Sequence, residues 1–489
     1  MKSYIKFFSV VSMGVLMASC TSDTLESEPQ GYINPEQIEA SAKWNPNVML
    51  GQSIGISYTS FVQGSGGTSD HDDFGQKSVD IATDLMSGDM VMAALSYGWF
   101  TADAKLQNNT KDRNRTYMIW RYYFQVIKAA NAIFDAVGGD EKYPEGENLM
   151  YFGQAKVMRA YAYFNLVNLY ARPYSESKST KALPIYRSQL APATVEYSTV
   201  DEIYALILKD LDDAVYALEG QGREMKALPD EYVARGLRAY TYLQMGNYAK
   251  AAEDAKTVIE SGEYPIMTAS DILTSGFNSI KIGSWMWGID LTVDNSPALP
   301  TFWGHVDYFT YSYAAAGAYK VIPDNLYVEI PATDLRKKWF NPSYKLMPVG
   351  KFYDSARKPM GNRLWDNDEV YMRSEEMYLI LAEASARDND LVTAQQALGY
   401  LLAERDETTA ATVAQMDQAA LLDAIYYNWR VEMWGEGRGL MTMKRFKKTV
   451  TRGSNDASPN KNMSISYTDD RLYFQVPQNE LNNNPNYKE

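Results

Sequence analysis

The amino-acid sequence predicts an all-α dominated fold, in which a scaffold of tetratricopeptide-like helical pairs supports long irregular loop excursions that carry the binding surface. Apolar residues recur at three- and four-residue steps in several separate blocks, which is the period of amphipathic helices. One block, 231–264, has about the length of one tetratricopeptide repeat. Two other long stretches, 51–104 and 265–368, show little helical period.

The first two helical blocks are expected at 120–137 and 151–171. The second is apolar almost all round, so we expect it deep in the structure. Pro173 stops it, because proline cannot continue a helix.

The later blocks carry clear boundary signals. Thr199 and Glu202 have the spacing of a capping box, which predicts a helix that begins there and ends near Gly220. Helical pairs follow at 231–264 and 370–405. Such pairs bury their faces by stacking on their neighbours.

We expect one helical scaffold with two excursions rather than two independent domains. The scaffold covers about 115–264 and 369–446, and the excursions cover about 51–104 and 265–368. Irregular stretches of this length in a compact protein are usually functional or carry a small structure of their own. Ligand-binding side chains are therefore sought there.

The amino terminus resembles a bacterial lipoprotein signal. Lys2 and Lys6 precede a short apolar run and small residues, and Cys20, the only cysteine, follows. We therefore expect residues 1–19 to be a signal peptide and Cys20 to carry lipid. An ordinary secretory signal with a chance cysteine is the alternative. The acidic, polar stretch 20–40 is expected to be a solvated tether.

Charge and composition exclude some functions. The formal net charge is −14, and loss of Lys2 and Lys6 with the signal changes −14 to −16. The one strong basic cluster is 444–448, so nucleic acid is not an expected partner. The chain has 37 Tyr, 16 Phe and 10 Trp but two His. This balance favours a stacking surface over acid–base catalysis, although many aromatics also fill the core.

Five segments, in this order, resemble the SusD/RagB family of Bacteroidetes surface lipoproteins: Trp120–Ile133, Gln154–Val167, Tyr371–Ala384, Arg430–Arg438 and Val476–Asn486. The resemblance implies an outer-membrane, surface-exposed lipoprotein that binds glycans, or peptides in some relatives. It also implies a SusC-like TonB-dependent transporter as partner. Trp429 departs from the family pattern, in which an acidic residue usually precedes the arginine.

Aromatic residues in the irregular stretches are the candidate ligand-binding residues, because a flat ring can stack on the C–H face of a sugar. They are Trp99, Trp285, Trp287, Trp303, Tyr308 and Tyr311. The strand-like spacing of Trp285 and Trp287 would put both indoles on one face. For each residue, the alternative is that it fills the core of its own loop.

Two charged segments are candidates for a metal site and for a catalytic site. Residues 69–73 form a dense oxygen cluster, but they lack the glycine and distal Glu of a calcium loop, so we expect an exposed loop and no metal. Arg430, Glu432, Glu436 and Arg438 are expected to form ion pairs that lock a helix end rather than a catalytic carboxylate pair.

The sequence therefore predicts a non-catalytic, lipid-anchored protein that binds oligosaccharides and needs no cofactor. The same scaffold binding peptides is one alternative. A secreted glycoside hydrolase is another, and it would need two carboxylates at a fixed separation. No Gly-rich phosphate loop and no His-Glu-x-x-His motif is present.

Overall fold

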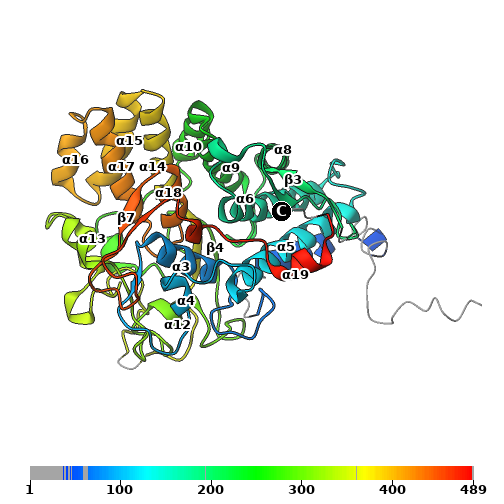
Figure 1. Ribbon diagram of the computed structural model, residues 1–489. Coiled ribbons are helices and arrows are strands. Elements are labelled where there is room, and N and C mark those ends of the chain that lie inside the picture. Colours follow the sequence, from blue (N-terminus) through cyan, green and yellow to red (C-terminus); the bar gives the residue numbers. More distant parts are fainter. Residues whose placement is uncertain are drawn as a thin grey trace, which may run out of the picture.

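The structure is a computed structural model that describes residues 37, 40–41, 45, 47–58, 64–192, 194–358 and 361–486. The predicted signal peptide at 1–19, Cys20 and almost all of the predicted tether lie outside these residues. Helices dominate the described part, as the sequence predicts (Figure 1). None of the described helices is both long and apolar enough to cross a membrane.

Long helices pack on one another in chain order. Helix α5 (Asn114–Ala136) packs on α6 (Glu147–Tyr170), and α6 packs on α8 (Val200–Leu218). Helix α8 in turn packs on α9 (Glu231–Met245). Most residues of α6 are buried, which confirms the prediction that this helix lies deep in the structure.

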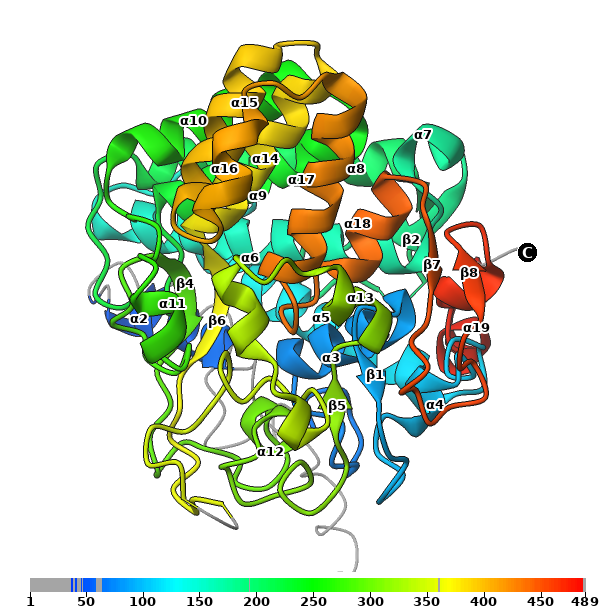
Figure 2. The same cartoon turned by 90° about the vertical axis from the view of Figure 1, so that its left-hand side faces the viewer.

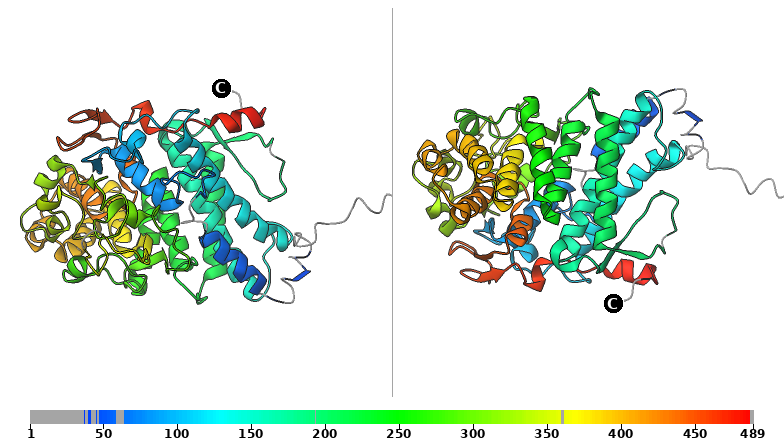
Figure 3. Two further views of the ribbon diagram at one scale, coloured as in Figure 1. Left: turned by 90° about the horizontal axis from the view of Figure 1, so that it is seen from below. Right: turned by 90° about the horizontal axis from the view of Figure 1, so that it is seen from above.

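The stack continues into the second half of the chain. Helix α9 packs on α10 (Tyr248–Ser261), and α10 packs on α14 (Ser374–Arg387), which contacts both α15 (Leu391–Ala403) and α17 (Gln418–Glu432). Figure 3 shows the cyan helices at one end of the molecule and the yellow and orange helices at the other. This order agrees with the stacked helical pairs that the sequence predicts, although the second pair begins at Ser374 and not at residue 370, because Glu369–Arg373 form a strand.

Local capping signals set the helix ends. The backbone N–H of Thr199 donates to the Glu202 carboxylate over 2.8 Å, and the Glu202 N–H donates to the Thr199 hydroxyl over 3.2 Å. The predicted capping box at the start of α8 is thus confirmed. Helix α9 ends at Gly246, whose φ of 78° is easily adopted by glycine.

Shorter elements fill the rest of the described chain. Most lie in the lower half of Figure 2, below the helical stack. They are α2 (Asn47–Tyr58), α3 (Gln76–Ser87), α4 (Thr101–Ala104), α7 (Tyr174–Ser177), α11 (Asp271–Thr274), α12 (Phe302–Val306), α13 (Asp324–Glu329), α16 (Glu407–Val413), α18 (Gly439–Arg445) and α19 (Gln478–Asn483), with 3₁₀ helices at Leu335–Trp339, Pro342–Tyr344 and Asp470–Leu472.

The described strands form small antiparallel pairs that tie distant segments together. Strand β1 pairs with β5 and β4 pairs with β6, and both pairs bring residues of the long irregular stretch 265–368 against other parts of the chain. The bounds are β1 (Val91–Met92), β2 (Lys181–Pro184), β3 (Tyr197–Thr199), β4 (Trp285–Ile289), β5 (Lys320–Val321), β6 (Glu369–Arg373), β7 (Thr449–Thr451) and β8 (Ser464–Ser466).

The prediction that 51–104 is irregular is wrong over α2 and α3. Every residue of α3 is buried, including its polar ones. The Asp84 carboxylate accepts hydrogen bonds from the backbone N–H groups of Gly435, Gly437 and Gly439. Helix α3 therefore joins the carboxyl-terminal part of the scaffold, and its polar residues hid the helical period.

The hydrophobic core has separate parts. The largest cluster runs through the stacked helices. A second cluster lies among α3, α12, β4 and the loops of 265–368, and it includes four tryptophans: Trp285, Trp303, Trp339 and Trp434. The long excursion thus has a core of its own, as segments of that length often do.

Candidate functional site

Three of the six predicted binding aromatics belong to the core. Trp285, Trp287 and Trp303 are at most 1% exposed. The Trp287 indole N–H donates to the carbonyl of Ala227 over 3.0 Å, and the Trp303 indole N–H donates to that of Asp368 over 3.2 Å. The prediction that these three rings bind a ligand is wrong for this structure, because a ring without exposed surface cannot stack on a sugar.

The prediction that Trp285 and Trp287 share a face is also wrong. Strand β4 pairs with β6, but the register shifts between the two tryptophans. Such an irregularity breaks the strict alternation of a strand. The Trp287 ring lies edge-on to Tyr161 in the large cluster, at 4.9 Å between centroids, whereas Trp285 belongs to the second cluster.

Trp99 lies in a group of rings at the surface, which we call the platform: His71, Tyr97, Trp99, Tyr311 and Tyr313. The imidazole of His71 stacks on Trp99 at 5.3 Å, with the ring planes 9° apart. Tyr313 lies edge-on to Tyr97, Trp99 and His71, at 5.5, 6.3 and 5.8 Å. The Tyr313 hydroxyl also hydrogen-bonds His71 Nδ1. These contacts fix four of the rings relative to one another, and Tyr311 lies beside Tyr97 and Tyr313 in the lining of one pocket.

A pocket of about 190 Å³ opens beside these rings. Its lining includes Tyr97, Tyr311, Tyr313, Leu299 and Ala316. Tyr97 is 61% exposed, so its ring is available to a ligand. The pocket combines aromatic faces with small side chains, which leaves room for a flat, partly apolar molecule.

Of the three remaining predicted residues, two belong to the platform and one does not. Trp99 and Tyr311 belong to it, whereas Tyr308 packs edge-on to Tyr344 at 5.0 Å, outside the pocket lining. The prediction missed Tyr97, Tyr313 and His71. Tyr97 and Tyr313 satisfy the same criterion as the predicted rings, since both are aromatics in irregular stretches.

The loop that carries Trp99 has a strained backbone. Tyr97 and Phe100 have φ values of 64° and 60°, and Gly98 between them has a φ of 83°. Residues with side chains rarely adopt this left-handed region, at a cost of about 1–2 kcal/mol each. Such strain persists where surrounding contacts impose it, and it concentrates at functional sites.

A buried layer supports the platform from below. The His305 ring stacks on Tyr313 at 4.7 Å and on Phe74 at 5.4 Å. His305 Nε2 hydrogen-bonds the backbone carbonyl of His71 over 2.8 Å, which assigns the proton to Nε2. Burial, with the nearby Lys320 charge, lowers the pKa of His305 well below its usual range. His305 therefore remains neutral and holds both Tyr313 and the His71 backbone.

Lys320, on β5, completes this layer. Its ammonium lies 3.4 Å from His305 Nδ1 and 3.3 Å from the His305 carbonyl. Within the described residues it makes no ion pair. Burial lowers the pKa of Lys320 from 10.5 to about 7, against the opposing attraction of Asp72 and Asp103.

We predict that Lys320→Met removes a pH dependence of stability. In the unfolded chain Lys320 titrates near 10.5, but in the folded chain it titrates near 7. The folded state thus binds the proton less tightly, and the wild type gains stability as pH rises through this window. The free energy of unfolding, measured by chemical denaturation, should be higher for Lys320→Met than for the wild type at pH 7. This difference should shrink from pH 7 to pH 10. A difference that stays constant with pH would contradict the shift.

Residues of the segment 361–368 border the platform on its Tyr311 side. The guanidinium of Arg363 lies 3.6 Å from the Tyr311 ring centroid, and the Trp365 indole N–H donates to the Tyr311 carbonyl over 3.0 Å. Gly361 has a φ of 91°, and a Cβ there would lie 2.2 Å from the Tyr311 backbone nitrogen. A glycine is therefore required for this close approach.

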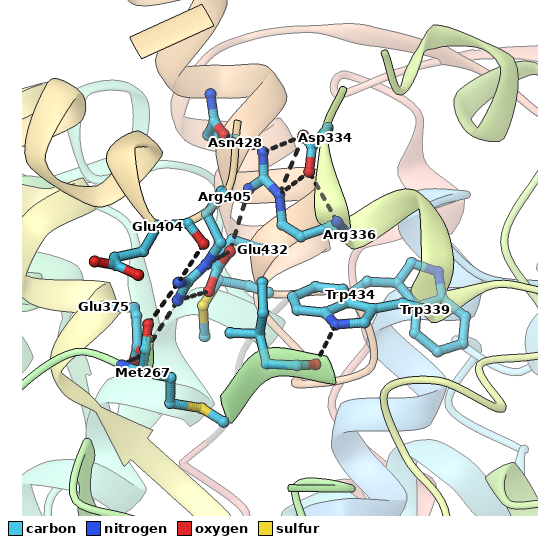
Figure 4. Close-up of polar contacts among 12 residues, drawn as sticks. Met267, Asp334, Arg336, Trp339, Glu375, Glu404, Arg405, Asn428, Glu432 and Trp434 are labelled. Atoms are coloured by element: carbon cyan, nitrogen blue, oxygen red, sulfur yellow. Dashed lines mark hydrogen bonds and ion pairs between the residues drawn. The ribbon is translucent and has the colours of Figure 1, made fainter. Parts of the chain in front are cut away.

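The carboxylates considered for catalysis are sealed in a buried charge cluster, part of which is drawn in Figure 4. Glu432 contacts Arg336, Arg373 and Arg405 at 3.2, 2.8 and 3.0 Å. Glu436 contacts Arg373 at 2.8 Å and Lys351 at 2.6 Å. We call this set, with Asp334 and Glu375, the charge cluster. The predicted ion pairing is confirmed, but the partners come from distant segments.

The other two residues of that segment pair elsewhere. Arg430 contacts Asp89 at 2.6 Å, and Arg438 contacts Glu376 at 2.8 Å.

Burial alone would raise the pKa of Glu432, but Arg405, Arg373 and Arg336 lower it well below its usual range. Opposing effects of the same kind lower the pKa of Glu436 to about 2. A general acid needs a raised pKa and access to substrate, and neither residue has them.

Residues 51–55 match the letters of the Gly-x-Ser-x-Gly nucleophile motif. That motif works only on a sharp turn between a strand and a helix, which exposes the serine. Ser53 instead lies in the middle of α2 and is 3% exposed. The match therefore does not form a hydrolase elbow.

The acidic segment 69–73 uses its carboxylates within the protein. Asp73 accepts hydrogen bonds from the backbone of Gly66 and Thr68, and Asp72 pairs with Arg115 at 2.8 Å. In the described part of the chain, no group of three or more acidic, His or Cys residues is arranged to hold a metal ion.

Two family models match the chain. Residues 69–243 match a model described as "Starch-binding associating with outer membrane", and residues 301–489 match the SusD family model. Together the two matches cover most of the sequence, including both sides of the platform. No curated protein matches the chain.

Solved structures share the fold. A SusD-like carbohydrate binding protein from Bacteroides vulgatus has a TM-score of 0.76 at 23% identity, covering 92% of this chain and 97% of that one. A SusD superfamily protein from Bacteroides thetaiotaomicron has a TM-score of 0.75 at 21% identity, covering 90% and 98%. A SusD superfamily protein from Bacteroides fragilis has a TM-score of 0.73 at 20% identity, covering 91% of this chain and 99% of that one.

Proposed function

Because this chain belongs to the SusD/RagB family, we propose that it is a non-catalytic surface lipoprotein that captures oligosaccharides and delivers them to a TonB-dependent transporter of the outer membrane. The family description supports a carbohydrate ligand and an association with the outer membrane. Lipid on Cys20 and the transporter partner rest on the sequence resemblance alone.

The observation that carries the proposal is the platform. The stacked pair of His71 and Trp99, with Tyr97 and Tyr313 beside it, offers aromatic faces next to a pocket. A pyranose ring presents C–H groups on its faces and hydroxyls at its edge, so it can stack on such rings while its hydroxyls stay hydrated. Of the six aromatic residues predicted to stack on a sugar, Trp99 and Tyr311 are the two that belong to the platform.

The shallow form of the site sets the expected affinity. A single sugar ring covers little surface, and binding costs the ligand its rotational freedom. One ring should therefore bind weakly, and affinity should rise with the length of the oligosaccharide. This behaviour suits a protein that must release its cargo to a partner.

We expect purified protein to retain glycans without cleaving them. The experiment incubates the full chain with a panel of oligosaccharides and peptides, then measures both retention and new reducing ends. Retention of glycans with no new reducing ends is the expected result, since the candidate carboxylates are sealed in the charge cluster. New reducing ends would favour a glycoside hydrolase. Retention of peptides alone would favour the peptide-binding alternative.

Lipid on Cys20 is expected to hold the protein at the membrane. Cys20→Ala should move the protein from the detergent phase to the soluble phase, because two or more acyl chains anchor a protein firmly. Affinity purification of the unsubstituted protein from native membranes should also recover a β-barrel partner. Membrane retention of Cys20→Ala would contradict the anchor, and recovery of the lipoprotein alone in mild detergent would contradict a stable complex.

A further inference from the structure

A second groove lies away from the platform, along α5. Two adjoining cavities, of about 290 and 360 Å³, share four lining residues: Trp120, Phe124, Lys128 and Glu480. We call them together the α5 groove. It lies between α5, the segment 186–191 and α19, which runs beside α5 in Figure 1. It shares no lining residue with the platform pocket.

The floor of the α5 groove is aromatic. Tyr117, Trp120 and Phe124 are spaced three and four residues apart, which places them on one face of α5. Trp120 and Phe124 contact each other at 4.8 Å between ring centroids. Tyr170 backs Trp120 at 5.1 Å, and Tyr186 lies edge-on to Phe124 at 5.7 Å. The rings are thus held in place without a ligand. Tyr117 and Phe124 are half-buried and present the faces open to a sugar, whereas Trp120 is 6% exposed and packs behind them.

The rim of the groove has unused hydrogen-bonding capacity. Within the described residues, the side chains of Gln125, Lys128 and Asn479 have no hydrogen-bond or ionic partner. Glu480 accepts from the Tyr197 hydroxyl and the Asn484 amide, both over 3.1 Å, and it forms no ion pair there with Lys128. Hydrogen-bond donors and acceptors, including positively and negatively charged groups, therefore line the α5 groove.

We propose that the α5 groove is a second binding site, for one or two pyranose rings of a neutral oligosaccharide. Aromatic floors stack on sugar rings, and amide, ammonium and carboxylate groups bind hydroxyls. Arg121, Lys128 and Glu480 give the trough charges of both signs, and a neutral polyol can hydrogen-bond to groups of either sign. The combined cavities fall in the range of roughly 300–1,000 Å³ typical of ligand sites.

The inference takes its ligand class from the proposed function but uses none of the platform residues. Two sites on one chain can hold a long glycan more tightly than either site alone, by about 10²–10⁴-fold where the ligand spans both. The groove would then explain how a shallow platform retains polymer.

Hydrogen–deuterium exchange of the full chain tests the proposal. The probes are malto-, cello-, xylo- and manno-hexaose, added one at a time. The reporter of the groove is α19, a short helix without buried residues, so its amides are expected to exchange readily. Peptides around Tyr97 and Tyr313 report the platform. At least one hexaose is expected to protect both regions in the wild type.

Variants separate the two sites. Trp99→Ala should lose protection at the platform and keep it at α19. A triple variant, Gln125→Ala with Lys128→Ala and Asn479→Ala, should do the opposite, and these exposed or half-exposed side chains support no core contact. Lys256→Ala, on the exposed face of α10, serves as the control and should change neither.

The outcomes distinguish this inference from the proposed function. Protection of the platform alone by every bound hexaose would overturn the second site and leave the platform intact. Protection of α19 alone would overturn the platform as the primary site. Loss of α19 protection in Trp99→Ala would overturn an independent groove, and no protection by any hexaose would overturn both.

Discussion

Replacing Glu432 with Gln is expected to lower the free energy of unfolding by about 3–5 kcal/mol, the usual cost of breaking a buried ion pair. Three guanidinium groups, of Arg336, Arg373 and Arg405, share this one carboxylate, and all are fully buried. Without the negative charge they would repel one another in a medium that screens poorly. Chemical denaturation followed by helical circular dichroism measures the loss.

An exposed pair provides the matched control. Lys256 and Glu260 lie 3.6 Å apart on α10, and both side chains are largely exposed. Glu260→Gln makes the same chemical change there, and it should cost at most about 1 kcal/mol. If Glu432→Gln were equally mild, the charge cluster would not contribute the stability that its burial predicts.

Replacing Trp99 with Ala is expected to weaken oligosaccharide binding by at least tenfold, which corresponds to about 1.4 kcal/mol. The indole is the largest face of the platform, and its loss also removes the stacking partner of His71. Central aromatic side chains carry binding energies of this size. The melting temperature should change little, because the ring lies on a loop outside the helical stack.

Another stacked aromatic pair provides a control for non-specific binding to exposed rings. Tyr378 and Tyr400 form another stacked pair on α14 and α15, at 5.0 Å and 7° between the planes, and Tyr400 is 58% exposed. Tyr400→Ala removes an exposed stacked ring away from the platform. It should leave binding unchanged in the same titration. Equal losses in both variants would mean that exposed rings bind without a specific site.

The scaffold could be predicted from the sequence because its signals are local. The capping box at Thr199 and the apolar period of α8 depend on residues a few positions apart, and the structure confirms both. Helix α3 was missed because it buries Asp80 and Asp84. Gln76 and Lys77 in the same helix bind Asp80, whereas the partners of Asp84 lie far along the chain. Periodicity reports only which residues are apolar, not which polar residues are buried.

The site was harder to predict, because burial of an aromatic ring depends on distant contacts. Trp285 pairs with Arg373 across β4 and β6, and the register shift beside it sends Trp287 into the other cluster. Nothing within a few residues of either tryptophan encodes that outcome. Trp99 lies at the surface, and its stacking partner His71 belongs to the acidic segment 69–73, whose composition predicts only an exposed loop.

A crystal structure of the protein with a bound oligosaccharide tests the central claim most directly. The probe is a glycan that the wild type retains in the panel, soaked or co-crystallised with the unsubstituted chain. We expect a sugar ring against Trp99 and Tyr97, at the mouth of the pocket beside Tyr313. A ligand bound only elsewhere, for example on Tyr378 and Tyr400 with the platform empty, would contradict the account.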